Sequence, residues 1–204
     1  MFASLLLPLA FAQGEPAAQV YADTQRRLAA ISSLSVRIHP GEFSDTDHHD
    51  VQYAYLRPNM AAMGGWNVGW KTDGKRTVRN DSEDRYNRPA ASDDLATAAL
   101  LGFESFAPPL VRPVPTGIAR SSTLNGISLL AIDLRVPGNA DTVLFIDPRT
   151  RLPIGSGRHF EGVDHFETGY FVDTKVNLIP ESFKVNWIRP ASQVYGELRK
   201  WLAI

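Results

Sequence analysis

The chain has 204 residues, no cysteine, and 21 basic against 22 acidic side chains, which gives a net charge of −1. This length suits one domain with a sizeable core, and the lack of cysteine excludes disulfides, redox thiols and thiolate zinc sites. Interspersed charges of both signs do not form the basic surface that nucleic acid requires. Stability must therefore come from packing, and we expect no nucleic-acid partner.

Residues 1–12, MFASLLLPLAFA, form an uncharged apolar run that ends in the small-x-small pattern Ala10-Phe11-Ala12. About ten apolar residues are too few to span a bilayer, which takes roughly 20. The run therefore predicts a cleaved secretory signal, although the Lys or Arg usual before such a run is missing. A buried N-terminal strand is the alternative. We expect residues 13–204 to be one exported, soluble domain.

Few segments carry a helical pattern. Pro16 suits the first position of a helix, and an apolar stripe from Val20 to Ile31 predicts a helix over residues 16–31. A second helix is predicted over residues 92–103, with Ser92 as N-cap. Acidic residues in its first turn complement the helix dipole, and Gly102 closes it.

Period-2 alternation dominates the rest of the chain. It predicts strands over residues 34–38, 51–55, 130–136 and 183–187, with a hairpin signal at Asn125-Gly126. One-sided alternation is typical of antiparallel sheets with one covered and one wet face. Strands interrupted by one mid-chain helix, with another helix leading in, predict an α+β fold whose sheet is partly covered by helices.

The densest cluster of polar side chains is at residues 45–50, where Asp45, Asp47 and Asp50 surround His48 and His49. These residue types suit zinc. Adjacent histidines, however, point to opposite faces of a strand, and the spacing matches no established zinc pattern. The cluster favours a solvated turn, so we expect no metal and no cofactor.

The sequence also gives little support for a nucleophilic serine, because Ser156 lies in Gly-Ser-Gly and lacks the spacing of a nucleophile elbow. We therefore expect a protein that is not an enzyme. A metal-dependent hydrolase that uses the Asp/His cluster is the least favoured alternative.

Residues 144–171 and 179–185 carry a characteristic order of turns. An apolar strand ends in Asp147, the turn PRT leads to Leu152-Pro153, and a Gly162 turn separates two further strands. Pro180 and Phe183 follow. This order resembles the second half of the LolA-type outer-membrane lipoprotein carriers. The first half is also similar, in the strand with a basic-Pro element, YAYLRPNMAAM, and in the hairpin around Asp73-Gly74-Lys75.

The resemblance implies a strongly curved antiparallel sheet, a half-barrel, with helices covering its concave face. Residues 13–204 are then a single LolA-like domain in the periplasm, after a signal peptide at residues 1–12. The implied function is a carrier or chaperone that binds lipoprotein acyl chains or other lipids in a hydrophobic cavity, in outer membrane biogenesis. The implied partners are those lipids, an inner-membrane release complex and an outer-membrane receptor, with the protein itself a monomer.

An envelope sensor or adaptor on the same fold, related to RseB-type regulators, is the alternative function, because fold alone does not fix function.

The resemblance also names site candidates. Residues suited to a lid or to a lipid cavity are Leu95, Leu100, Leu101, Phe103, Phe106, Met60, Met63, Trp66 and Trp70. Methionine suits ligands of variable shape, but each of these side chains is also an ordinary core residue. Carriers of this family latch the lid with a basic residue on an early strand. Arg37 and Arg57 are the candidates here, and a surface salt bridge is the alternative for each.

Overall fold

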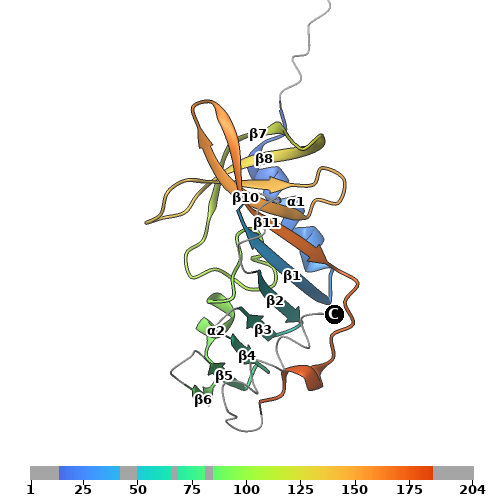
Figure 1. Cartoon of the computed structure of the whole chain (residues 1–204), viewed down its shortest axis with the longest axis vertical. Coiled ribbons are helices and arrows are strands. Elements are labelled where there is room, and N and C mark those ends of the chain that lie inside the picture. Colours follow the sequence, from blue (N-terminus) through green and yellow to red (C-terminus); the bar gives the residue numbers. More distant parts are fainter. Residues whose placement is uncertain (1–13, 42–49, 66–68, 81–84, 186–204) are drawn as a thin grey trace, which may run out of the picture.

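The computed structural model describes residues 14–41, 50–65, 69–80 and 85–185. The described strands form one sheet, in which every pairing is antiparallel (Figure 1). The strands are β1 (Ser33–Pro40), β2 (Val51–Leu56), β3 (Met60–Gly64), β4 (Gly69–Thr72), β5 (Arg76–Asn80), β6 (Arg85–Pro89), β7 (Val114–Leu124), β8 (Ile127–Arg135), β9 (Thr142–Ile146), β10 (Pro153–Phe160) and β11 (Val163–Asp173).

The sheet consists of two meanders joined at one seam. Its order is β6-β5-β4-β3-β2-β1-β11-β10-β9-β8-β7, so β1 pairs with the last strand, β11. At this seam Val36 lies opposite Val172, and Ile38 lies opposite Tyr170. Strands β6 and β7, which are consecutive in the chain, lie at opposite edges of the sheet. The segment between them must therefore run along the whole sheet.

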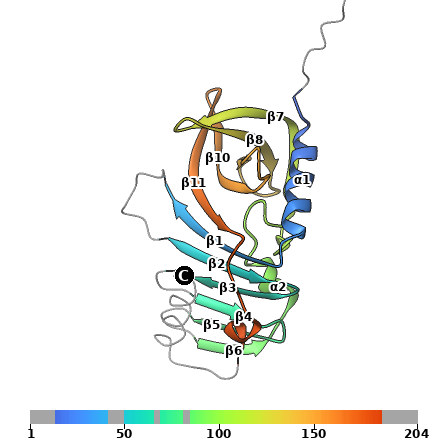
Figure 2. The same ribbon diagram turned by 90° about the vertical axis from the view of Figure 1, so that its right-hand side faces the viewer.

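Two helices lie on one face of this sheet, which we call the inner face. Helix α1 (Ala17–Ala29) lies over the β7–β8 end, and helix α2 (Ser92–Ala96) lies over the β4–β5 end on the same side (Figure 2). Side chains of α1 and of the stretch after α2 share one core with strands of both meanders. The predicted fold class, a curved antiparallel sheet with helices on one face, is confirmed.

The second predicted helix is shorter than expected, because α2 ends at Ala96 instead of at residue 103. The N-cap lies one residue earlier than predicted, since Ala91, not Ser92, is the N-cap and donates its N–H to the Asp94 carboxylate at 2.7 Å. Beyond Ala96 the chain forms successive turns, and Gly102 has a positive φ of 86°. We call residues 97–107 the covering segment.

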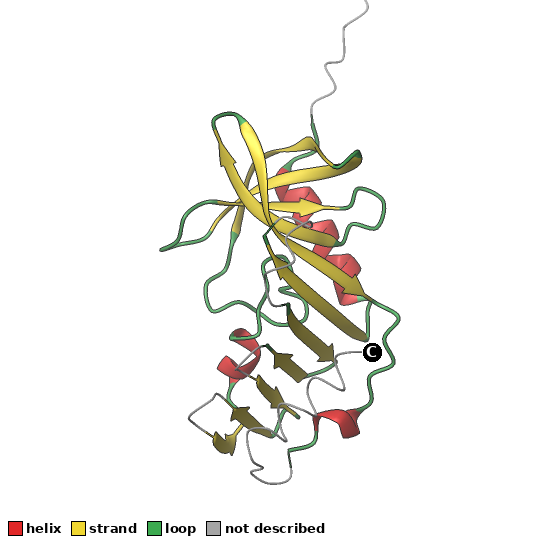
Figure 3. Ribbon diagram, viewed as in Figure 1, coloured by secondary structure: helices red, strands yellow, loops and turns green. Residues whose placement is uncertain are grey.

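The opposite, outer face carries two smaller clusters. The C-terminal stretch, which contains the 3-10 helix η1 (Pro180–Phe183, Figure 3), packs Leu178 and Phe183 against Ala54 and Ala62 of β2 and β3. The strand predicted over residues 183–187 was therefore wrong for its described part, because Phe183 ends η1. The other cluster contains Leu129, Ala131, Val143 and Phe145 together with Phe166. Among the described helices, none is long and apolar enough to cross a membrane.

Candidate functional site

The inner face has an apolar floor drawn from both meanders. Strand alternation places every second side chain on this face, and Leu34 and Tyr55 are cross-strand partners there. The floor residues are almost completely buried: Leu34, Val36, Tyr55, Ile132, Leu134, Leu144, Ile146 and Tyr170. Because the floor crosses the β1–β11 seam, it belongs to neither half of the sequence alone.

The covering segment packs two aromatic side chains against this floor. Phe103 is fully buried, with its ring 5.9 Å from the ring of Tyr170. Phe106 is also buried, with its ring 5.6 Å from that of Tyr55. The other lid candidates, Leu95, Leu100 and Leu101, are partly buried against the same core. The structure thus brings all five predicted lid residues to one place, and their contact with lipid stays a prediction.

The remaining described cavity candidates lie on two different faces of the sheet. Met63 and Trp70 are cross-strand partners on β3 and β4 and pack against the inner core. Met60 lies three residues from Met63 on the same strand and so faces the other way, against Leu178 and Phe183 on the outer face. Met60 therefore does not share the cluster of Met63, and its contact with lipid stays an untested prediction. Trp66 lies outside the described residues.

Polar contacts attach the covering segment to α1. The Gln25 side chain donates to the Gly102 carbonyl at 2.8 Å and accepts from the Ser105 N–H at 2.9 Å. The Ser105 hydroxyl donates back to the Gln25 carbonyl at 2.7 Å. A further bond runs from the Tyr55 hydroxyl on β2 to the Ala98 carbonyl. Sequence reasoning missed these contacts, because nothing in the chain marks Gln25 and Ser105 as partners.

Arg57 joins three elements at once. Its guanidinium donates to the Ile31 carbonyl at 2.8 Å and to the Leu28 carbonyl at 3.1 Å, at the end of α1. The same group lies 4.3 Å above the centre of the Phe106 ring, and burial lowers the pKa of Arg57 from its ordinary value. Of the two latch candidates, Arg57 is the one that contacts the covering segment.

Arg37 lies on the outer face, because it alternates with the inner-face residues Val36 and Ile38 along β1. It is positioned 4.5 Å above the Phe171 ring and 3.4 Å from Asp50. These contacts are with β11 and Asp50 rather than with the covering segment, and a latch role for Arg37 stays an untested prediction. Asp50 also contacts His39 at 2.7 Å, whereas residues 45–49 of the predicted polar cluster lie outside the described residues.

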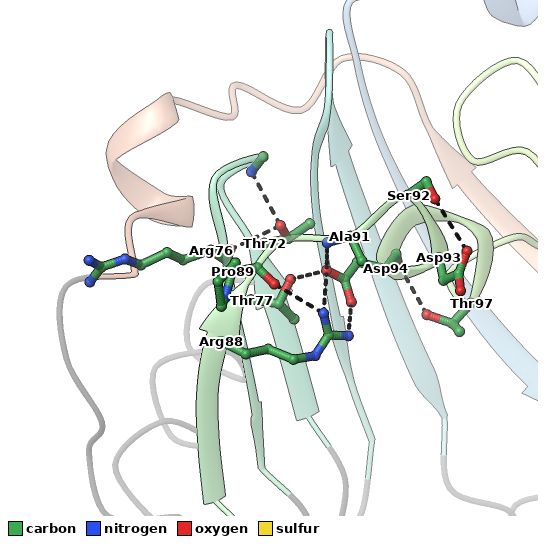
Figure 4. Close-up of polar contacts among 11 residues, drawn as sticks. Thr72, Arg76, Thr77, Arg88, Pro89, Ala91, Ser92, Asp93, Asp94 and Thr97 are labelled. Carbon is green, nitrogen blue, oxygen red and sulfur yellow. Dashed lines mark hydrogen bonds and ion pairs between the residues drawn. The ribbon is translucent and has the colours of Figure 1, made fainter.

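At its other end the covering segment begins from a clamp on α2. The buried Asp94 carboxylate accepts hydrogen bonds from the Thr77 hydroxyl on β5 and from the Ala91 N–H, and it pairs with the Arg88 guanidinium on β6 (Figure 4). The Thr97 hydroxyl donates to the Asp94 carbonyl at 3.0 Å. This network holds α2 against the edge of the sheet.

A pocket of about 250 Å³ lies between α2 and the inner face of β3–β6. Its lining combines apolar side chains with charged and hydroxyl groups: Met63, Trp70, Thr77, Arg79, Arg88, Asp93, Asp94 and Thr97. Met63 and Trp70 also pack against the inner core, so the pocket adjoins the floor that the covering segment occupies. This volume is slightly below the usual range for sites that enclose a small molecule.

The tyrosines around the inner face are not suited to proton transfer. Burial raises the pKa of Tyr55 well above its ordinary value and raises the pKa of Tyr170 to about 12. Burial, followed by the negative charge of Glu104, also raises the pKa of Tyr21. All three phenols are neutral at physiological pH and pack in the core; the Tyr55 and Tyr170 hydroxyls also donate hydrogen bonds, to the Ala98 carbonyl and the Ser156 hydroxyl. Within the described ranges, no three metal-ligating side chains form a group.

No family model matches the chain, and no curated protein does. Among solved structures, LprF from Mycobacterium bovis is 13% identical, with 82% of this chain and 98% of that chain covered and a TM-score of 0.44. A putative outer membrane lipoprotein-sorting protein domain from Vibrio parahaemolyticus is 8% identical, with 81% and 94% covered and a TM-score of 0.42.

The LolA superfamily protein NE2245 from Nitrosomonas europaea also matches this chain. It is 7% identical, with 81% of this chain and 97% of that chain covered and a TM-score of 0.33. These likenesses concern the fold alone.

Proposed function

We propose that this protein is an exported carrier that shields the acyl chains of lipoproteins or other lipids against the inner face of its sheet. The observation that supports the proposal is the covering segment, which buries Phe103 and Phe106 in the core without belonging to the sheet or to a long helix. Such a segment is a lid: when it withdraws, the apolar floor is free to receive a ligand.

The energetics favour exchange of the lid for an acyl chain. Withdrawing two phenylalanine side chains costs about 3–6 kcal/mol, at roughly 1.5–3 kcal/mol for each. A 16-carbon chain that takes their place contributes about 12 kcal/mol of transfer free energy, at about 0.8 kcal/mol per CH₂. The empty protein therefore stays closed, which hides apolar surface that would otherwise promote aggregation, while a lipid chain supplies enough free energy to open it.

The polar attachments of the lid are few enough to break. Net contributions of about 0.5–1.5 kcal/mol per hydrogen bond mean that the Gln25–Ser105 contacts and the Tyr55–Ala98 bond hold the lid with only a few kcal/mol. The Asp94 clamp lies at the other end and secures α2 to β5 and β6. We propose that the lid opens at the Gln25 end and turns about the α2 end.

A disulfide lock tests this proposal. The chain contains no cysteine, so Gln25→Cys combined with Ser105→Cys introduces a single pair at a place where the two residues already touch. The probe is a monoacylglycerol with a fluorescent acyl chain, added to the protein of residues 13–204. The reduced double variant should take up the probe, and the oxidised form should not.

Each single-cysteine variant is the control for oxidation itself and should take up the probe under both conditions. Equal uptake by the oxidised and reduced double variant would show that the lid does not gate binding. If the wild-type protein takes up neither this probe nor a triacylated lipopeptide, the carrier function is wrong and the sensor or adaptor function is favoured instead.

A further inference from the structure

The charged groups that line the α2 pocket balance one another. Arg79 and Arg88 contribute two positive charges, and Asp93 and Asp94 contribute two negative charges. A site that recognises a phosphate or carboxylate normally presents an excess of positive charge or a cluster of free N–H donors. This lining has no such excess, so it does not favour an anionic group.

The Arg88 guanidinium is already paired with a carboxylate of the protein, that of Asp94. Its two terminal nitrogens both face the Asp94 carboxylate, one of them at 3.3 Å, and one also donates to the Pro89 carbonyl at 3.1 Å. Asp94 is only 4% exposed and is held by the Thr77 hydroxyl and the Ala91 N–H as well. A phosphate would have to displace a buried carboxylate that is fixed on several sides. The Arg88 guanidinium is therefore not available for bidentate hydrogen bonding to an incoming anion.

Asp93 adds a second negative charge to the lining. It lies next to Asp94 in the first turn of α2 (Figure 4), and its side chain is exposed. Its negative charge offsets that of Arg79, which is exposed on the same lining. The remaining lining consists of the apolar Met63 and Trp70 and the hydroxyl groups of Thr77 and Thr97. Both hydroxyls donate to Asp94, so their oxygens can still accept a hydrogen bond, which suits a partly apolar group that carries a donor.

We infer that this pocket receives the uncharged, hydroxyl-bearing or amide-bearing end of the bound lipid, such as the glycerol of an acylglycerol, and rejects a phosphate. The inference rests on the proposed carrier function, because Met63 and Trp70 connect the pocket to the apolar floor where the acyl chain would lie. It adds the class of head group: neutral lipids and N-acylated or glyceride ends, in preference to phospholipids with a net negative charge.

The test compares two probes with the same fluorescent acyl chain, a monoacylglycerol and a lysophosphatidic acid, each below its micellar concentration. The wild-type protein should bind the neutral probe at least about fivefold more tightly, the order of the effect of one unit charge at contact distance in water. Asp93→Asn should lower the ratio of the dissociation constants of the anionic and neutral probes by a similar factor, whereas Arg79→Gln should raise that ratio. Asp141→Asn removes the same charge from an exposed position far along the chain and should leave the ratio unchanged.

The outcomes separate the two proposals. If the wild type binds the anionic probe as tightly as the neutral one, or if Asp93→Asn and Asp141→Asn act alike, the head-group inference is overturned while the carrier function stands. If neither probe binds while a triacylated lipopeptide does, the inference is overturned and the carrier function stands; if the lipopeptide also fails to bind, both are overturned. Circular dichroism of each variant confirms that it is folded, which the exposed position of Asp93 favours.

Discussion

The Arg57 guanidinium lies 4.3 Å above the Phe106 ring while it donates to carbonyl oxygens at the end of α1. One side chain thus stabilises the helix terminus and the lid at the same time. Backbone carbonyls at the end of a helix lack partners within the helix, and a cation is favoured there by the helix dipole. A cation above an aromatic ring adds about 0.5–2 kcal/mol.

Replacing Arg57 with Met keeps much of the aliphatic stem but removes these interactions. We expect a loss of about 1–3 kcal/mol in the free energy of unfolding, the scale of hydrogen bonds from a charged group, and faster uptake of an acyl probe because the lid is held less firmly. Denaturant titration and stopped-flow fluorescence measure the two effects. Arg37→Met, on the outer face, is the matched control and should change neither rate nor affinity. Identical behaviour of the two variants would show that Arg57 is no latch.

A substitution of Leu100, a partly buried residue of the lid, tests whether the lid contributes to lipid binding. Replacing it with Asp introduces a charge where the side chain packs against the inner core, and we expect weaker probe binding by 1 kcal/mol or more, the scale of one buried apolar side chain. Leu110 is 65% exposed, so Leu110→Asp provides a control with the same chemical change. Equal affinities for all three proteins would place the binding site elsewhere.

Phe103 should respond differently, because it is fully buried. Phe103→Ala leaves a cavity in the core, and we expect a loss of about 3–5 kcal/mol in stability. If thermal denaturation shows a loss below about 1 kcal/mol, the covering segment is not packed in solution as the structure has it.

Acid sensitivity is expected at the β10–β11 hairpin. Burial alone would raise the pKa of Asp164, but hydrogen bonds and charge from Arg120 and His159 outweigh it and hold that pKa below its ordinary value. The folded pKa is thus lower than the unfolded value of about 3.9. The contribution to stability is therefore fully present above about pH 5 and is lost as the pH falls through the folded pKa.

Asp164→Asn should remove this dependence, so its melting temperature should fall less steeply between about pH 5 and pH 3 than that of the wild type. Asp141→Asn, which removes an exposed carboxylate, should retain the wild-type slope. Parallel curves for Asp164→Asn and the wild type would contradict the assignment.

The alternation of apolar residues in the sequence was sufficient to predict an antiparallel sheet and the faces of β1, β2 and β8, but it also predicted a strand over residues 183–187 where the described part contains the end of η1. It placed Leu34, Val36 and Ile38 together, and Arg37 opposite them, so attention to strand parity would already have favoured Arg57 over Arg37 as the latch candidate. Parity also separates Met60 from Met63, which were grouped by residue type although the two are an odd number of positions apart. Local pattern specifies faces well when it is followed residue by residue.

The covering segment is where local pattern failed. The apolar spacing of residues 92–103 suits a helix, but bonds from Tyr55 and Gln25 to carbonyls at Ala98 and Gly102 replace the helical ladder there. These partners come from β2 and α1, and no short-range signal marks them. The pairing of β1 with β11 is equally hidden, because two strands of compatible composition at opposite ends of a chain do not reveal that they are neighbours.

That pairing also bears on the order in which the molecule can assemble. Strand β1 is among the first strands to be synthesised, whereas its partner β11 is the last. Until β11 arrives, β1 is an edge strand, and the apolar floor that spans the seam lacks its second half. Such long-range closure slows folding, so a chain threaded through a membrane from its N-terminus would stay extended and transport-competent until nearly all of it had crossed. Under the export proposed above, late closure of the sheet is a useful property of the topology itself.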